Sequence, residues 1–205
     1  MLSNEHIWQL DDPSYMGKSQ KLSEAIRSTL VDWLIQIHYN FKLLEESLFL
    51  TVNIIDRYLS KNTLSKDQVQ LVGVAAMLIA TKYEEIYPPL LKDFVFVSDN
   101  SCSAEQILEM EKAILFQIDF DLQLTSPLRF LERFGKLARL DTITFLLSQY
   151  MLEVGLLDSK MNQFSASLQA ISAIYTAKKY LKYYNNKHDD IQAIIADYNL
   201  GDKYS

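Results

Sequence analysis

The sequence predicts an all-α protein, and three observations about composition and apolar pattern support this. Among 205 residues there are only 5 glycines and 4 prolines, which is low for a sheet protein rich in tight turns and normal for a helical one. Apolar residues recur at steps of three and four, the period of a helix. The stretch 71–80 is apolar on every face, as in a helix buried among others.

The apolar stretch lies in a longer helix predicted over residues 65–89. Its middle reads LVGVAAMLIA and is too short to cross a bilayer, so we expect a core helix sheathed by its neighbours. Ser65 begins a capping-box pattern, and the two prolines at 88–89 cannot continue a helix. Residues 81–85 are polar and charged, which indicates a helix end that reaches solvent and can present side chains to a partner.

Five further segments of the first half carry a helical pattern. We expect a short helix over residues 4–10, followed by a breaker, and longer helices over 22–42 and 45–59. Residues 90–100 are rich in β-branched and aromatic residues, but without a pairing partner in view we predict a short helix. A last helix opens at the capping box of Ser103 and runs to about residue 117.

A shift of 97 residues aligns a few identical residues at corresponding points of the two halves, which indicates a duplicated helical domain. Ser126 followed by proline restarts the pattern, and we expect a second core helix at about 165–184 and a possible helix near 189–198. We therefore predict an N-terminal helix and linker over 1–21, a first domain over 22–124 and a second over 125–205. The second has no room for a fifth helix, so either it is short or the chain was cut. The residues that the shift aligns are Ala76, Ala80, Lys82 and Tyr83 with Ala173, Ala177, Lys179 and Tyr180.

Charge and composition exclude several classes of function. The formal net charge is −6 and no run of lysine or arginine supplies a phosphate footprint, so nucleic acid is not expected as a partner. Three scattered histidines and one cysteine give no metal-ligand spacing and no internal disulfide, as expected in a reducing compartment. The N-terminus does not resemble a signal peptide and no stretch predicts a membrane span, so we expect a cytosolic or nuclear protein.

No arrangement of residues predicts an active site. The glycine-rich phosphate loops and the nucleophile-elbow motif do not occur. Cys102 has no histidine nearby in sequence, and we expect a surface thiol. Glu84 and Glu85 are adjacent and point about 100 degrees apart on a helix, which favours a solvated helix end over an acid–base pair. We therefore predict no catalytic residue, no metal and no cofactor.

Two charged residues lie among apolar neighbours, Arg27 in the helix over 22–42 and Asp56 in the helix over 45–59. An unpaired charge in such surroundings is costly. One interpretation is that the two residues pair with each other. The other is that Arg27 extends to solvent while Asp56 pairs locally with Arg57 or Lys61, and spacing alone does not separate the two.

Several long segments resemble the cyclin box, the helical domain of the cyclin family. They are RSTLVDWL from Arg27, NIIDRYL from Asn53 and QLVGVAAMLIATKYEEIYPP from Gln70. The EEIYPP ending, PSYM at 13–16 and SPLRFL at 126–131 resemble the mitotic A/B group, with the B type favoured. The resemblance covers essentially the whole chain, and motifs this long are very specific.

The resemblance implies two five-helix cyclin boxes in tandem, with the second apparently truncated. It also implies a non-catalytic subunit that binds and activates a cyclin-dependent protein kinase in mitotic control, in the nucleus and the cytoplasm. The alternative is a cyclin-fold scaffold that binds other proteins without activating a kinase. No cofactor, nucleic acid or membrane is implied.

The resemblance also assigns a kinase-binding surface and a buried pair. Lys82 and Glu111 match the residues that grip the mobile regulatory helix of the kinase. Arg27 and Asp56 match a structural ion pair, which favours the first interpretation above. The apolar contact positions are matched by Ile79, Leu115 and Phe120, and Ala80 allows close approach.

A second implied surface docks R-x-L peptides on the helix over 22–42. The matching residues are Ile26, Leu30, Trp33, Gln36 and Gln70. This chain has Thr29 and Gln36 where the family usually has an apolar residue and an acid, so we expect weaker docking. The stripe of Ile26, Leu30 and Trp33 fits either an exposed patch or ordinary core.

Overall fold

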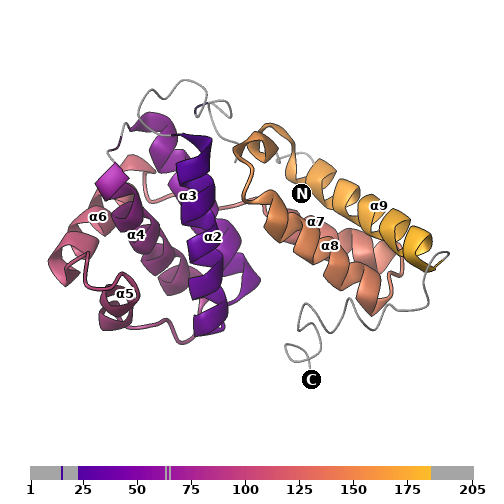
Figure 1. The fold of residues 1–205 in the computed structure, drawn as a ribbon, viewed down its shortest axis with the longest axis horizontal. Coiled ribbons are helices and arrows are strands. Elements are labelled where there is room, and N and C mark those ends of the chain that lie inside the picture. The colour runs from indigo at the N-terminus through magenta and orange to yellow at the C-terminus, as the bar shows by residue number, and fades with distance from the viewer. Residues whose placement is uncertain (1–14, 16–22, 63, 65, 186–205) are drawn as a thin grey trace. The chain divides into compact units, whose positions relative to one another are not determined.

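In a computed structural model, the described part of the chain comprises residues 15, 23–62, 64 and 66–185, and no strand occurs within it (Figure 1). The prediction of an all-α protein is confirmed. The chain divides into two compact units, Met1–Ser126 with Gly155–Ser165, and Pro127–Val154 with Ala166–Ser205. The helices predicted over 4–10 and 189–198, and the cap predicted at Ser65, lie outside the described residues.

The described residues of the first unit form five α-helices and a short 3-10 helix. Each helix predicted between residues 22 and 117 is present, including the short one within 90–100, where a strand was the alternative. The helices are α2 Glu24–Phe41, α3 Glu45–Lys61, α4 Lys66–Glu84, α5 Leu91–Val97 and α6 Ala104–Gln117, and the 3-10 helix is η2 Ser159–Gln163.

Helix α4 is the centre of the first unit, as its apolar run predicts. It packs against α2, α3, α5 and α6 (Figure 1), and residues 72–81 are all buried. Gly73 permits the close approach of α2, because a Cβ atom there would lie 2.7 Å from Cδ1 of Leu30. Such a contact is too short for two carbon atoms, so the Leu30 side chain or α2 itself would have to shift.

Local side chains fix where these helices begin. Ser23 caps α2, since its hydroxyl accepts from the backbone N–H of Ile26. The capping box at the start of α6 is confirmed, with Ser103 and Gln106 each accepting from the other's backbone N–H.

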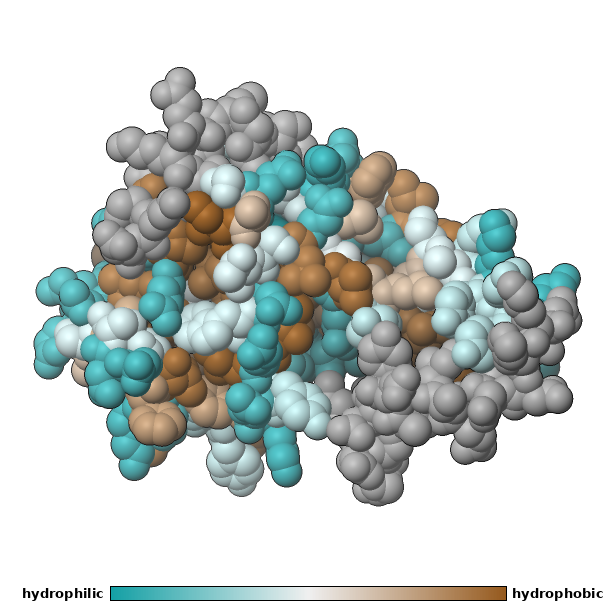
Figure 2. All heavy atoms as spheres, in the orientation of Figure 1, coloured by the Kyte–Doolittle hydropathy of each residue, from teal (hydrophilic) through white to brown (hydrophobic). Residues whose placement is uncertain are grey.

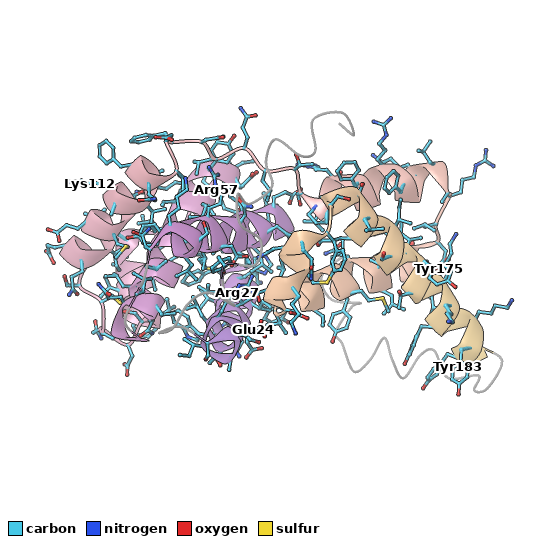
Figure 3. The ribbon with its side chains drawn as sticks, turned by 90° about the horizontal axis from the view of Figure 1, so that it is seen from above. Glu24, Arg27, Arg57, Lys112, Tyr175 and Tyr183 are labelled. Atoms are coloured by element: carbon cyan, nitrogen blue, oxygen red, sulfur yellow. The ribbon has the colours of Figure 1, made fainter. Side chains whose placement is uncertain are left out.

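The second unit contains α7 Pro127–Leu137, most of α8 Thr142–Gly155 and α9 Ala166–Asn185. Helix α9 corresponds to the second core helix predicted at 165–184, and it packs against α7. It is less sheathed than α4: Ala170, Ala173 and Ala177 form one buried face, while Tyr175 and Tyr183 are exposed (Figure 3). The alanines recur at steps of three and four, so a single stripe of α9 meets its neighbour.

Candidate functional site

An ion pair between α4 and α6 stands at the surface of the first unit. Nζ of Lys82, in the last turn of α4, lies 2.7 and 2.9 Å from the two carboxylate oxygens of Glu111 on α6. The lysine side chain is 48% exposed and the glutamate side chain 13%. Because an ammonium group has three N–H donors and Glu111 takes two, Lys82 retains a donor for an acceptor on a partner.

The apolar residues assigned to this surface differ in how far they reach it. Ile79 and Ala80 are buried in the core, so their side chains offer almost no area to a partner. Leu115 is half-buried and Phe120 is 59% exposed. The accessible part of the predicted surface is therefore Lys82, Leu115 and Phe120.

Other exposed apolar side chains adjoin these residues in sequence. Tyr83 follows Lys82, and Phe116 follows Leu115; both are exposed. Figure 2 shows that, on one face, apolar side chains reach the surface of the first unit between hydrophilic ones. Exposed apolar area next to an accessible charge is typical of a protein-binding surface.

Arg27 and Asp56 form a buried, bidentate ion pair. Nε of Arg27 lies 2.6 Å from Oδ1 of Asp56 and Nη2 lies 2.7 Å from Oδ2, with each side chain only 1% exposed. The position of Arg27 on α2, one turn after Glu24, is labelled in Figure 3. The geometry is that of the paired interpretation, and Arg57 instead donates to the carbonyl of Asp121.

The pair is the centre of a larger network from distant segments. The Tyr15 hydroxyl donates to Oδ1 of Asp56 at 2.6 Å, and Nδ2 of Asn162 donates to Oδ2 at 2.8 Å. Nη1 of Arg27 donates to the carbonyl of Leu156 at 2.8 Å. The segment Gly155–Ser165 thus belongs to the first unit through hydrogen bonds to these two charges, although α7 and most of α8 precede it in sequence.

The network also shifts how its members titrate. Burial alone lowers the pKa of Arg27, but the attraction and hydrogen bonds of Asp56 outweigh it, and the pKa is raised above its ordinary value. Burial and the negative charge of Asp56 raise the pKa of the Tyr15 hydroxyl well above its usual range. Both shifts favour the charged guanidinium and the protonated hydroxyl, the forms that donate hydrogen bonds to Asp56.

A shallow groove lies along α2, where the peptide site was predicted. It has a volume of 470 Å³. Its lining contains Thr29 and four of the five residues predicted for the peptide site, three of them on α2 and one on α4. Leu30 is buried, whereas Ile26 and Trp33 are half-buried, so the stripe is partly core and partly groove wall. The lining residues are Ala25, Ile26, Thr29, Leu30, Trp33, Val69 and Gln70.

Gln36, the remaining predicted residue, lies on α2 three residues beyond Trp33 and is exposed. Its amide donates to a carboxylate oxygen of Asp32 at 3.1 Å. An acid therefore lies one turn away from the position where the family usually has one, although its carboxylate already accepts a hydrogen bond.

Two sequence-based expectations were wrong. Glu85 is not part of a solvated helix end: its Oε1 accepts from the backbone N–H of Leu44 at 2.7 Å and from the hydroxyl of Ser47 at 2.6 Å. It thereby caps α3, whose own N-cap residue provides no side-chain acceptor. Cys102 is not a surface thiol but is buried in the apolar core of the first unit.

Within the described residues, no group of His, Cys, Asp and Glu has the arrangement needed to hold a metal ion. No helix among them is long and apolar enough to span a membrane. Sequence reasoning missed Tyr15, Asn162 and Phe116. Only the PSYM motif at 13–16 could have pointed to Tyr15.

Comparison with known families identifies the chain. The model of the cyclin N-terminal domain matches residues 1–123, and the model of the cyclin C-terminal domain matches residues 125–200. The chain belongs to the cyclin family. Its two helical units are therefore those of a tandem cyclin fold.

Several curated relatives of this cyclin carry B-type or mitotic names. It is 43% identical over 168 residues to the G2/mitotic-specific cyclin-B of Dictyostelium discoideum, covering 82% of this chain and 38% of that protein. It is 45% identical over 166 residues to Cyclin-B2-1 of Oryza sativa subsp. japonica, covering 81% and 40%. It is 41% identical over 180 residues to the G2/mitotic-specific cyclin cdc13 of Schizosaccharomyces pombe, covering 88% and 37%. The expected likeness to B-type cyclins is confirmed, and the chain spans about two fifths of the length of these relatives.

Solved structures share the fold at low sequence identity. A viral cyclin from herpesvirus saimiri matches with a TM-score of 0.79 and 18% identity, covering 96% of this chain and 86% of that one. The CAK complex from Chaetomium thermophilum bound to ATP-γ-S matches with a TM-score of 0.58 and 18% identity, covering 90% and 60%. These matches establish the cyclin fold.

Proposed function

We propose that this cyclin is a non-catalytic regulatory subunit that binds and allosterically activates a cyclin-dependent protein kinase in mitotic control. The observation that carries the proposal is the accessible Lys82–Glu111 pair, with half-buried Leu115 and exposed Phe120 on and beside the same helix. Membership of the cyclin family and likeness to B-type relatives support it. We propose that it works in the nucleus and the cytoplasm.

The mechanism is a shift of population in the kinase. An active kinase needs its strand-three lysine paired with a glutamate of its regulatory helix, and an ordered activation loop. A rigid surface that contacts this arrangement better than the inactive one raises the population of the active state. The packing of α4 against α6 provides such a rigid surface, because residues 72–81 are buried and fix the position of the lysine that follows.

The same cyclin is proposed to dock R-x-L-type substrates or inhibitors along α2. The groove, with Ile26 and Trp33 on its walls, supports this part of the proposal. Docking here would hold a substrate near the kinase and raise its effective concentration without taking part in catalysis.

The test is a kinase assay with purified cyclin-dependent catalytic subunits. Lys82→Ala and Glu111→Ala are each expected to weaken binding and activation severely while leaving the cyclin folded, since an exposed ion pair contributes at most about 1 kcal/mol to stability. Lys92→Ala, an exposed lysine on α5, is the matched control and should have no effect.

A charge exchange makes the test sharper. Lys82→Glu combined with Glu111→Lys keeps an intramolecular pair but reverses the charges offered to the kinase. We expect it to fold and to fail in activation. If the exchange restored activation, the pair would serve only the fold of the cyclin. If the native chain bound a catalytic subunit without raising its activity, the scaffold alternative would replace the proposal.

A further inference from the structure

The end of α6 has an unusual backbone. After the helix ends at Gln117, Asp119 and Phe120 both adopt left-handed conformations, with φ of 54° and 55°. The backbone N–H of Phe120 donates to the carbonyl of Leu115 at 2.9 Å, which folds the chain back over the last turn of the helix. The side chain of Phe120 is thereby held against the helix rather than carried away from it.

Phenylalanine is an unfavourable residue for this conformation. Asp and Asn tolerate the left-handed region because their short polar side chains can hydrogen-bond locally, whereas an aromatic side chain gains no such compensation. The other consecutive left-handed pair in the described residues, Asp99 and Asn100, consists of tolerant types. Strain of this kind persists only where the surrounding structure maintains it, and it is often found at functional sites.

The strained Phe120 and the earlier Phe116 form a pair of exposed aromatic rings. The ring centroids of Phe116 and Phe120 lie 5.4 Å apart with an interplanar angle of 79°, an edge-to-face contact. Phe116 is 71% exposed and Phe120 is 59% exposed. Single exposed apolar residues are common, but two aromatic rings fixed against each other at the surface are a preformed apolar contact.

The rings continue the surface centred on the ion pair. Glu111 and Leu115 are four residues apart and share one face of α6. Lys112 and Phe116, also four apart, form the adjacent exposed stripe, and Lys112 is labelled in Figure 3. Along α6 the charged Glu111 is therefore followed by the half-buried Leu115 and the exposed Phe116, and Phe120 lies just beyond the end of the helix.

We infer that Phe116 and Phe120 together form an aromatic anchor that inserts into an apolar hollow on the catalytic subunit. This inference rests on the proposed function and adds Phe116 to the contact with the kinase. The charged pair orients the partner, and the rings provide the desolvated area that strengthens binding. Rings with two side-chain torsions each, already in contact, lose little conformational entropy when they are covered.

The experiment uses the full chain and the catalytic subunit that it activates in the assay above. Phe116→Ala is expected to weaken binding by about tenfold or more, as for other aromatic residues near the centre of an interface. Phe96→Ala is the matched control, because Phe96 is 77% exposed on α5, and it should leave the affinity unchanged. Combining Phe116→Ala with Phe120→Ala should weaken binding by less than the product of the two single effects, since each ring positions the other.

The outcomes separate this inference from the proposed function. Loss of binding with Lys82→Ala but not with Phe116→Ala would overturn the aromatic anchor alone. Failure of the native chain to bind any catalytic subunit would overturn both. If Phe116→Ala changed only the self-association of the cyclin, measured by sedimentation, the rings would contact a second copy of the chain, and the inference would be wrong.

Discussion

Replacing Asp56 by alanine removes the acceptor that four hydrogen bonds share. Tyr15, Asn162 and two nitrogens of Arg27 all donate to its carboxylate, at 2.6 to 2.8 Å. After the change, the guanidinium stays in a site where it is 1% exposed and retains backbone carbonyls, such as that of Leu156, as acceptors. A carbonyl dipole does not neutralise a full buried charge.

The expected cost is large because the remaining charge cannot regain its hydration. Removing one partner of a buried ion pair typically destabilises a protein by about 3–5 kcal/mol. The donors of Tyr15 and Asn162 also lose their acceptor, and an unsatisfied buried group costs about 1–3 kcal/mol unless water replaces the partner. We therefore expect Asp56→Ala to lie at or above the upper end of the first range. Asp56→Asn, which keeps the volume and loses the charge, separates the electrostatic part from the cavity.

Urea unfolding followed by tryptophan fluorescence measures this effect in the first unit, because Trp33 lies there on α2. The decisive comparison is a cycle of Asp56→Ala, Arg27→Ala and the double variant. With both charges removed, no uncompensated ion remains, so the double variant should lose less stability than the sum of the singles. Additive losses would refute the argument that the two charges stabilise each other.

Two further predictions concern the groove and the second unit. Gln36→Glu should tighten binding of a labelled R-x-L peptide by about tenfold, with part of the gain lost in high salt, because an acid forms a charge-assisted hydrogen bond with the peptide arginine. Trp33→Ala should abolish that binding, and equal peptide affinities for all three proteins would show that the groove does not dock the peptide. In the second unit, the hydroxyl and backbone N–H of Thr144 donate to the Asp141 carboxylate and lower its pKa below the usual value. The ionised carboxylate therefore stabilises the fold fully at pH values above its pKa in the unfolded chain, and this stabilisation is lost as the pH falls through its lower pKa in the folded chain. Thermal melts at neutral pH and below about pH 4 should therefore show a larger loss for the native chain than for Asp141→Asn, and an equal loss in both would contradict the assignment.

The helices of this cyclin could be predicted from sequence because their causes are local. The apolar run of α4 and the capping box of Ser103 each lie within a few consecutive residues, and both were read correctly. The environment of Asp56 could not be predicted in the same way. Tyr15 and Asn162 are 41 and 106 residues away from it, and a single sequence contains no information on such distances.

The charged residues of the candidate surface could be predicted from the sequence, but the exposure of its apolar residues could not. Lys82 and Glu111 came from matching motifs, and the structure brings them into contact. Ile79 was assigned to the same surface by its match to the family, but a motif match does not show how far a side chain is exposed, and the structure buries Ile79. Phe116 was missed for the complementary reason, since exposed aromatic residues look like core residues in a sequence. Glu85 was misread because its acceptor role depends on α3, some forty residues earlier in the chain.

The return of Gly155–Ser165 to the first unit has a consequence for synthesis on the ribosome. Helices α2 to α6 emerge first. The carbonyl of Leu156, which accepts a hydrogen bond from Arg27, is 129 residues further along and emerges only after α7 and α8. The first unit therefore stays incomplete until the nascent chain has emerged beyond Ser165. A product released after α6 would keep its buried arginine without the Leu156 carbonyl and its buried aspartate without Asn162. Such a fragment is expected to unfold readily and to be recognised by chaperones and proteases, so only chains that extend beyond this segment can close the first unit.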